Sequence, residues 1–105
     1  MPGTEISGDS VPRRCAEVRT RRYRGRLFIA NTAQAFELNE QAEFAFRLVD
    51  GAATVREIGA QLAEHYRYAV ADAVSDTAEL MTLFAERQVV EFAEDHAVAE
   101  SSVQS

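Results

Sequence analysis

The pattern of hydrophobic and polar residues changes its period once in the middle of the chain. Residues 33–38 alternate, with Phe36 and Leu38 on the same side, which is typical of a half-buried strand. Directly afterwards, apolar residues recur at helical spacing until the Asp50-Gly51 pair, which suits a helix end. We therefore predict a strand over residues 33–38 and a helix over about residues 40–50, with Asn39 as the N-cap.

Two further strands are predicted before this point. Residues 17–23 alternate and residues 26–30 are almost continuously apolar, and the Arg24-Gly25 pair between them suits a tight turn. A second turn candidate, Asn31-Thr32, leads into the strand at residues 33–38. Connections this short favour an antiparallel meander.

Two further helices are predicted after it. Thr54 and Glu57 have the spacing of a capping box, which opens a helix over about residues 55–66. Helical spacing predicts a third helix over about residues 71–87, and residues 89–92 suit a brief strand or an apolar tail. The predicted fold class is α+β: a three-stranded antiparallel β-sheet followed by three helices.

Length and composition fit one domain in a reducing compartment. The 105 residues include 47% hydrophobic residues, enough for a core, and the single cysteine, Cys15, excludes an internal disulfide. No apolar run reaches the ~20 residues of a membrane span, so we expect no membrane association and a cytoplasmic location. Small and polar residues predict disordered segments at residues 1–13 and 93–105, around a domain at residues 14–92.

The net charge of −6 is unevenly distributed. Residues 13–26 contain seven arginines and one glutamate, whereas residues 27–105 contain four arginines and fourteen acidic residues. The acidic body argues against nucleic acid as the main partner, because neutralisation of phosphates drives such binding. The basic segment still allows a local contact with an anionic group.

No arrangement of residues suits catalysis or metal binding. His65 and His96 lack a second histidine or cysteine at metal-ligand spacing, and no glycine-rich phosphate loop is present. No serine or cysteine has a base at a recognisable spacing. We therefore expect no enzyme activity, no catalytic residue, no metal and no cofactor.

An ordered set of residues carries a family resemblance. The set consists of Leu38-Asn39-Glu40, Asp50-Gly51, Thr54-Val55, Glu57-Ile58, Leu62, Tyr66 and Asp76. With this spacing the chain resembles the PqqD-like family of small peptide chaperones, also called RiPP recognition elements, over about residues 18–90. The family often has glycine where this chain has Gln88.

The resemblance implies a winged-helix-like arrangement and a non-catalytic, free-standing adaptor. Such proteins bind the leader segment of a ribosomally made precursor peptide and present it to a maturation enzyme, such as a radical SAM enzyme, a peptidase or a cyclase. The peptide adds to the exposed edge of the third strand, with the third helix as the other wall. The residues this implies for peptide binding are Ala33, Gln34, Ala35, Phe36, Glu37, Leu38, Asp76, Leu80, Leu83 and Arg87.

Some residues of the third helix and of the basic segment suit more than one role. Leu80 and Phe84 also suit an ordinary core, and Arg87 also suits a solvated helix end. The arginines of residues 19–26 suit solvated charge, contact with an acidic stretch of the peptide or its enzyme, or contact with nucleic acid.

Two other functions compete with the adaptor. A winged-helix DNA-binding regulator has the same general topology, but the third helix is acidic where DNA readout needs basic or amide side chains. A protein-interaction module without a peptide role is the third candidate.

Overall fold

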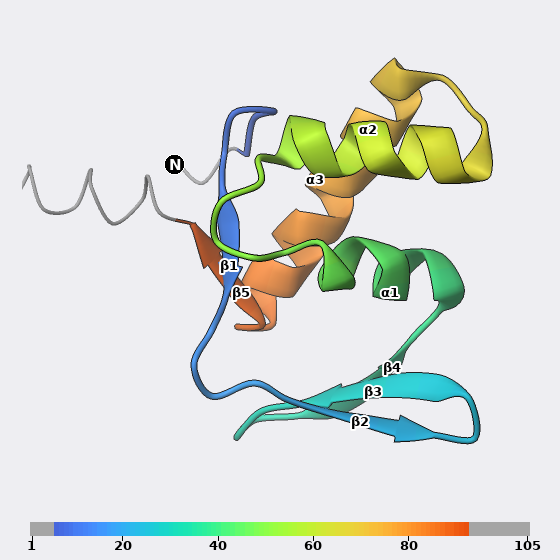
Figure 1. Cartoon of the computed structure of the whole chain (residues 1–105). Coiled ribbons are helices and arrows are strands. Elements are labelled where there is room, and N and C mark those ends of the chain that lie inside the picture. Colours follow the sequence, from blue (N-terminus) through green and yellow to red (C-terminus); the bar gives the residue numbers. More distant parts are fainter. Residues whose placement is uncertain (1–5, 93–105) are drawn as a thin grey trace, which may run out of the picture.

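A computed structural model describes residues 6–92, which form two small sheets and three helices (Figure 1). In chain order the elements are β1 (Pro12–Arg14), β2 (Arg19–Tyr23), β3 (Arg26–Ala30), β4 (Ala35–Leu38), α1 (Glu40–Arg47), α2 (Val55–Tyr66), α3 (Val70–Glu86) and β5 (Val90–Phe92). β2, β3 and β4 form an antiparallel sheet in that order, and β1 pairs with β5. This confirms the predicted α+β class, with a three-stranded antiparallel sheet followed by three helices. Figure 1 shows the three helices on one side of that sheet.

The sheet follows from the predicted turns. Arg24 and Gly25 both have positive φ, 53° and 79°, and join β2 to β3 as a two-residue hairpin loop. This backbone conformation matches the twist of the flanking strands. Within β3, Leu27 and Ile29 are buried, and Leu38 of β4 is buried with them. One face of the sheet therefore packs on the core.

Side-chain caps begin the first two helices as predicted. The Asn39 carboxamide oxygen accepts a hydrogen bond from the Ala42 N–H at 2.8 Å. Thr54 Oγ1 accepts from the Glu57 N–H at 3.0 Å, and the Glu57 carboxylate accepts from the Thr54 N–H at 2.8 Å. The second pair of contacts is the predicted capping box.

The predicted end of the first helix was wrong by three residues. α1 ends at Arg47, because the N–H groups of Leu48 and Val49 bond to carbonyls three residues back and tighten the last turn. The Asp50 carboxylate instead accepts from the N–H groups of Ala52 and Ala53, both at 2.9 Å. Asp50 thus organises the loop before α2 and lies outside α1.

The core lies between the sheet and the helices. Its largest fully buried side chains include Ile29 from β3, Phe46 from α1, Ile58 and Leu62 from α2, and Met81 and Phe84 from α3. The Phe46 and Phe84 rings meet edge to face, with centroids 6.0 Å apart. Phe84 is therefore a core residue. None of the helices within residues 6–92 has the length and apolar character needed to cross a membrane.

The segment expected to be disordered at the start of the chain is partly ordered. β1 pairs with β5 from the other end of the described chain, and Arg13 pairs with Glu91 at 3.0 Å. Upstream of β1, the carbonyls of Gly8 and Ser10 accept from the first N–H groups of α2, both at 2.9 Å. Those N–H groups have no partner within the helix, so the segment satisfies them. Residues 1–5 and 93–105, the rest of the expected disorder, lie outside the described residues.

Candidate functional site

β4 is an edge of the three-stranded sheet. Its only neighbour there is β3, and the register pairs Ile29 with Phe36 and Leu27 with Leu38. Just before β4, the Asn31 N–H donates to the Gln34 carbonyl at 2.9 Å. Backbone groups alternate in an antiparallel pair, so the N–H and C=O groups of Phe36 and Leu38 point toward β3.

The β2–β3 hairpin leads independently to the same assignment of the β4 backbone groups. Tyr23 and Arg26 flank the two-residue turn, and residues in this position exchange hydrogen bonds. The alternation along β3 then directs Phe28 and Ala30 toward β2, and leaves Leu27 and Ile29 to bond β4. It follows that the N–H and C=O groups of Ala35 and Glu37 point outward, away from the sheet.

Gln34 and Arg87 join the start of β4 to the end of α3. The Gln34 amide donates to the Arg87 carbonyl at 2.9 Å, and the Arg87 guanidinium donates back to the Gln34 side-chain oxygen at 3.3 Å. The same guanidinium lies over the Phe36 ring, 5.0 Å from its centroid. These contacts place Gln34, Phe36 and Arg87, all predicted site residues, next to one another.

A hollow of about 390 Å³ opens beyond the other end of β4. It is lined by Asn39, Gln41, Ala42, Leu62, Asp76, Thr77, Glu79, Leu80 and Leu83. Leu80 is half-buried and also packs on the core, whereas Leu83 is 39% exposed. The predicted α3 residues Asp76, Leu80 and Leu83 thus share one hollow that is apolar at its base.

A hydrogen-bonded chain runs beside this hollow. Gln41 donates to the Tyr68 hydroxyl at 3.1 Å, and that hydroxyl donates to Asp76 at 3.3 Å. Burial, together with the negative charge of Asp76, raises the pKa of Tyr68. The tyrosine therefore stays protonated and holds the Asp76 carboxylate at the rim.

The other predicted residues of the third strand do not present side chains to the hollow. Ala33 lies in the turn before β4, where its N–H donates to Asn31 at 2.9 Å. Ala35 and Glu37 place their side chains on the outer face of the sheet, and Glu37 pairs there with Arg26. Leu38 is buried. Of Ala35 and Glu37, only the backbone is available at the edge.

Sequence reasoning missed four polar residues around the hollow: Asn39, Gln41, Tyr68 and Glu79. Glu79 follows Asp76 by three residues, so helical spacing places both on the same face of α3, and this spacing could have located Glu79. Tyr68 lies between helices and carries no periodic signal. Asn39 and Gln41 belong to a helix start, where capping explained them without any further role.

Comparison with known proteins agrees with this geometry. The family model of coenzyme PQQ synthesis protein D (PqqD) matches residues 26–90. The chain belongs to the PqqD family. Its fold is similar to the solution NMR structure of the PqqD truncation of Methylobacterium extorquens PqqCD, a functional and stand-alone RiPP recognition element. That match has 30% sequence identity and a TM-score of 0.73, and covers 87% of this chain and 99% of the other. No curated protein sequence matches the chain.

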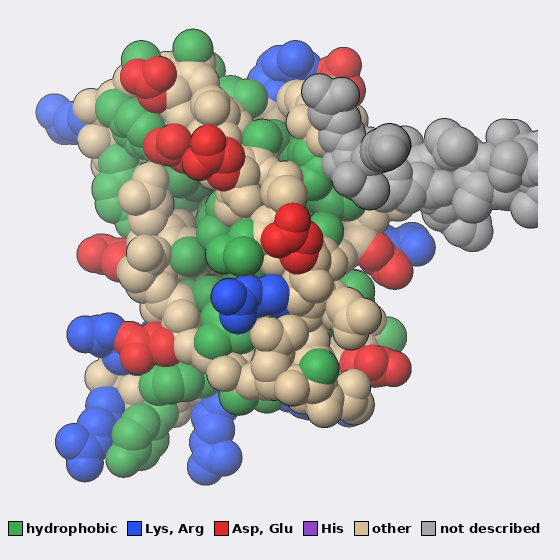
Figure 2. Space-filling view, turned by 180° about the vertical axis from the view of Figure 1, so that it is seen from behind, with side chains coloured by type: hydrophobic (Ala, Val, Ile, Leu, Met, Phe, Trp, Pro, Cys, Tyr) green, Lys and Arg blue, Asp and Glu red, His purple; other side chains and the backbone are tan. Residues whose placement is uncertain are grey.

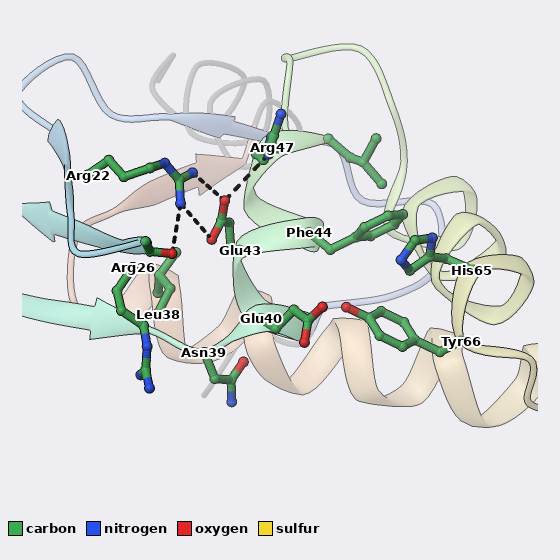
Figure 3. A pocket seen from close by; sticks show the side chains of 12 residues that line it. Arg22, Arg26, Leu38, Asn39, Glu40, Glu43, Phe44, Arg47, His65 and Tyr66 are labelled. Carbon is green, nitrogen blue, oxygen red and sulfur yellow. Dashed lines mark hydrogen bonds and ion pairs between the residues drawn. The ribbon is translucent and has the colours of Figure 1, made fainter.

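A second hollow of this PqqD-family chain lies between the β2–β3 hairpin and the helices α1 and α2 (Figure 3). It has a volume of about 900 Å³. On its wall, Glu43 binds both Arg22 of β2 and Arg47 of α1, and Arg22 holds the pKa of Glu43 below its usual range. Phe44 stacks on His65 with centroids 4.4 Å apart. The Glu43 contacts hold the hairpin against α1, and with it the sheet that ends in β4.

Metal-ligating side chains do not cluster in the described part of this PqqD-family chain. Residues 6–92 contain no group of three or more histidine, cysteine, aspartate or glutamate side chains placed to hold a metal ion. Burial and the charge of Glu91 raise the pKa of the Cys15 thiol, which disfavours the nucleophilic thiolate. The candidate site is the β4 edge together with the α3 hollow, because the predicted residues Asp76, Leu80 and Leu83 line that hollow.

Proposed function

We propose that this chain is an adaptor that binds the leader segment of a ribosomally made precursor peptide and presents it to a maturation enzyme. The observation that carries the proposal is the β4 edge, whose outward backbone groups lie between the Arg87 contact and the α3 hollow. The similar Methylobacterium extorquens protein, itself a RiPP recognition element, supports the same role.

The leader would bind as an added strand. Its backbone would pair with the outward N–H and C=O groups of Ala35 and Glu37, which supply affinity for any extended peptide. Alternate leader side chains would then point toward α3, and the rest toward the outer face of the sheet. The first group would meet the hollow and therefore determine specificity.

The hollow indicates which leader residues fit. Leu80 and Leu83 would pack on an apolar leader side chain, and the Asp76 and Glu79 carboxylates would pair with a basic neighbour. At the other end, Arg87 would attract an acidic residue. A leader that runs antiparallel to β4 would therefore carry its apolar and basic residues on the N-terminal side of its acidic residues.

Fluorescence anisotropy tests this function. The probe is a labelled leader from the precursor peptide encoded beside the gene, and we expect a Kd of about 1 μM or tighter, equivalent to about −8 kcal/mol. Leu83→Ala should weaken binding about fivefold or more, because it removes an exposed apolar contact of the hollow.

Val70→Ala is the matched control. Val70 is 53% exposed on the same helix, but does not line the hollow. Its substitution should leave the Kd unchanged. If the leader causes no anisotropy change at high protein concentration, the adaptor function is wrong.

A further inference from the structure

Among the described residues 6–92, none covers the outer face of the three-stranded sheet. All five residues of β2 are exposed, and the helices lie on the other side of the sheet (Figure 1). A hollow of about 620 Å³ crosses this outer face, lined by Arg19, Thr20, Arg21, Tyr23, Phe28, Ala30 and Ala35. We call this surface, together with Arg24 at the hairpin turn, the arginine face.

The arginine face has an apolar centre. Tyr23 is 55% exposed and meets Phe28 edge to face, with ring centroids 6.4 Å apart. Ala30 and Ala35 are paired neighbours on β3 and β4 and continue the same surface. Such an exposed aromatic centre with a charged rim is typical of a surface that binds another macromolecule.

The guanidinium groups of Arg19, Arg21 and Arg24 have no carboxylate partner within the described part of the chain. Arg22, whose side chain lies on the helix side of the sheet, is paired with Glu43 of α1, and Arg26 is paired with Glu37 on the outer face. The Arg19 guanidinium contacts carbonyls of its own segment at 3.4 Å, and the Arg24 guanidinium lies over the Tyr23 ring. The Arg21 side chain has no hydrogen-bond or ion-pair partner among residues 6–92. Figure 2 shows several basic side chains projecting from the lower end of the molecule, where the sheet lies.

The charge of this surface determines its occupant. A second copy of the chain paired through β2 would set arginine against arginine, and like charges in direct opposition are destabilising. The neighbouring arginines already bind carboxylates rather than remaining solvated. The complementary partner is therefore a folded protein that surrounds an apolar contact with aspartate and glutamate side chains.

We propose that the arginine face docks the maturation enzyme through such an acidic surface, an inference that rests on the proposed function. β4 borders both the peptide site and the arginine face. A leader strand added at β4 would direct every second side chain toward the side occupied by the enzyme. The two surfaces would then hold peptide and enzyme at the same time.

Charge reversal tests the docking separately from peptide binding. Arg19→Glu/Arg21→Glu changes the arginine face, and Arg56→Glu/Arg67→Glu makes the same charge change on α2 and at its end. Affinities of each variant would be measured for the leader and for the purified maturation enzyme encoded beside the gene, after circular dichroism has shown native folding.

We expect the Arg19→Glu/Arg21→Glu variant to bind the leader with unchanged Kd and the enzyme about tenfold more weakly or worse, because close interfacial charge pairs carry such energies. The control variant should bind both normally. Unchanged enzyme affinity in the arginine-face variant would overturn the docking proposal while leaving the adaptor function intact. Loss of leader affinity in that variant would also overturn it, because the arginines would then belong to the peptide site.

Two further probes exclude other partners. Duplex DNA and vesicles containing anionic phospholipid should bind the parent chain only weakly at physiological salt, because the chain as a whole is acidic. Tight binding of either probe that Arg19→Glu/Arg21→Glu abolishes would overturn the docking proposal in favour of nucleic acid or a membrane surface.

Discussion

At the scale of single residues, Gln88 has the backbone conformation that most constrains the end of the fold. Its φ of 64° lies in the left-handed region, which lets the chain reverse between α3 and β5. The N–H groups of Gln88 and Val89 then bond back to the carbonyls of Ala85 and Phe84. Glycine adopts this conformation without the steric cost of a Cβ atom, which explains its frequency here in the PqqD-like family.

Gln88→Gly should therefore stabilise the domain. Relief of the left-handed strain should raise the free energy of unfolding by about 0.5–1 kcal/mol, in part offset by the greater entropy of the unfolded chain. Gln88→Val should lower it, because a β-branched residue fits this region worst. Urea denaturation measures both, and a glycine variant less stable than the parent would show that the turn is not strained.

Two carboxylates, the half-buried Glu43 and the exposed Asp50, give the fold a pH dependence. The Arg22 side chain holds the pKa of Glu43 below its usual range, and hydrogen bonds from the Ala53 and Ala52 N–H groups do the same for Asp50. A lowered pKa in the folded state means that the unfolded chain binds more protons in acid. Stability from these groups is therefore present above the unfolded-state pKa and is lost as the pH falls through the folded-state pKa.

Glu43→Gln tests this linkage. The variant should be less stable than the parent at pH 7, and its stability should fall less steeply between pH 5 and pH 3 because one titrating group is gone. Chemical denaturation across this range gives both curves. Parallel curves for the variant and the parent would show that the Arg22–Glu43 pair contributes no pH dependence.

At the scale of elements, backbone groups alternate along β4 between those that bond to β3 and those that point outward to a leader. The N–H of Phe36 points toward β3, opposite Ile29, whereas that of Glu37 points outward. Proline at Phe36 would therefore remove a hydrogen bond of the sheet. The sequence alone did not reveal which N–H groups of this strand face β3.

Phe36→Pro should be destabilised relative to Phe36→Ala, which lacks the same side-chain packing but keeps the N–H. We expect a difference of about 1 kcal/mol or more in the free energy of unfolding, the scale of a lost hydrogen bond together with backbone strain. Thermal and urea unfolding of the two variants provide the comparison. Equal stability would mean that the register assigned to β4 is wrong.

Elements with local signals were predicted well. Three signals each act within a few residues: the Arg24-Gly25 turn, the Asn39 cap and the Thr54–Glu57 capping box. Their sequence spacing is therefore sufficient to locate the starts of β3, α1 and α2. β1 escaped prediction because its stability comes from β5, and the Arg13–Glu91 contact spans 78 positions of sequence. A Gly-, Ser- and Pro-containing segment gives no local indication of such a partner.

At the scale of the whole molecule, the candidate site required tertiary placement. The family resemblance implied both β4 and the α3 residues Asp76, Leu80 and Leu83, which share the hollow. Tyr68 and Gln41 were not predicted, because only the tertiary fold brings the start of α1 beside the connection between α2 and α3 and beside Asp76. The separation of the β4 edge from the arginine face also depends on which face of the sheet the helices cover.

Addition of a leader peptide to the outer edge of β4 is the step on which the proposed adaptor function depends. Its most direct test is the Kd of the labelled leader for Glu37→Pro, which removes an outward N–H of β4, and for Thr20→Pro, which removes one on the opposite edge, β2. Glu37→Ala controls for loss of the Glu37–Arg26 ion pair. Proline at such outward positions is compatible with an edge strand.

We predict that all three variants unfold cooperatively, and that only Glu37→Pro weakens leader binding, by about 1 kcal/mol or more, which is about fivefold in Kd. Glu37→Ala and Thr20→Pro should bind like the parent. A folded Glu37→Pro variant with the Kd of the parent would contradict strand addition at β4, and a loss confined to Thr20→Pro would move the peptide to β2.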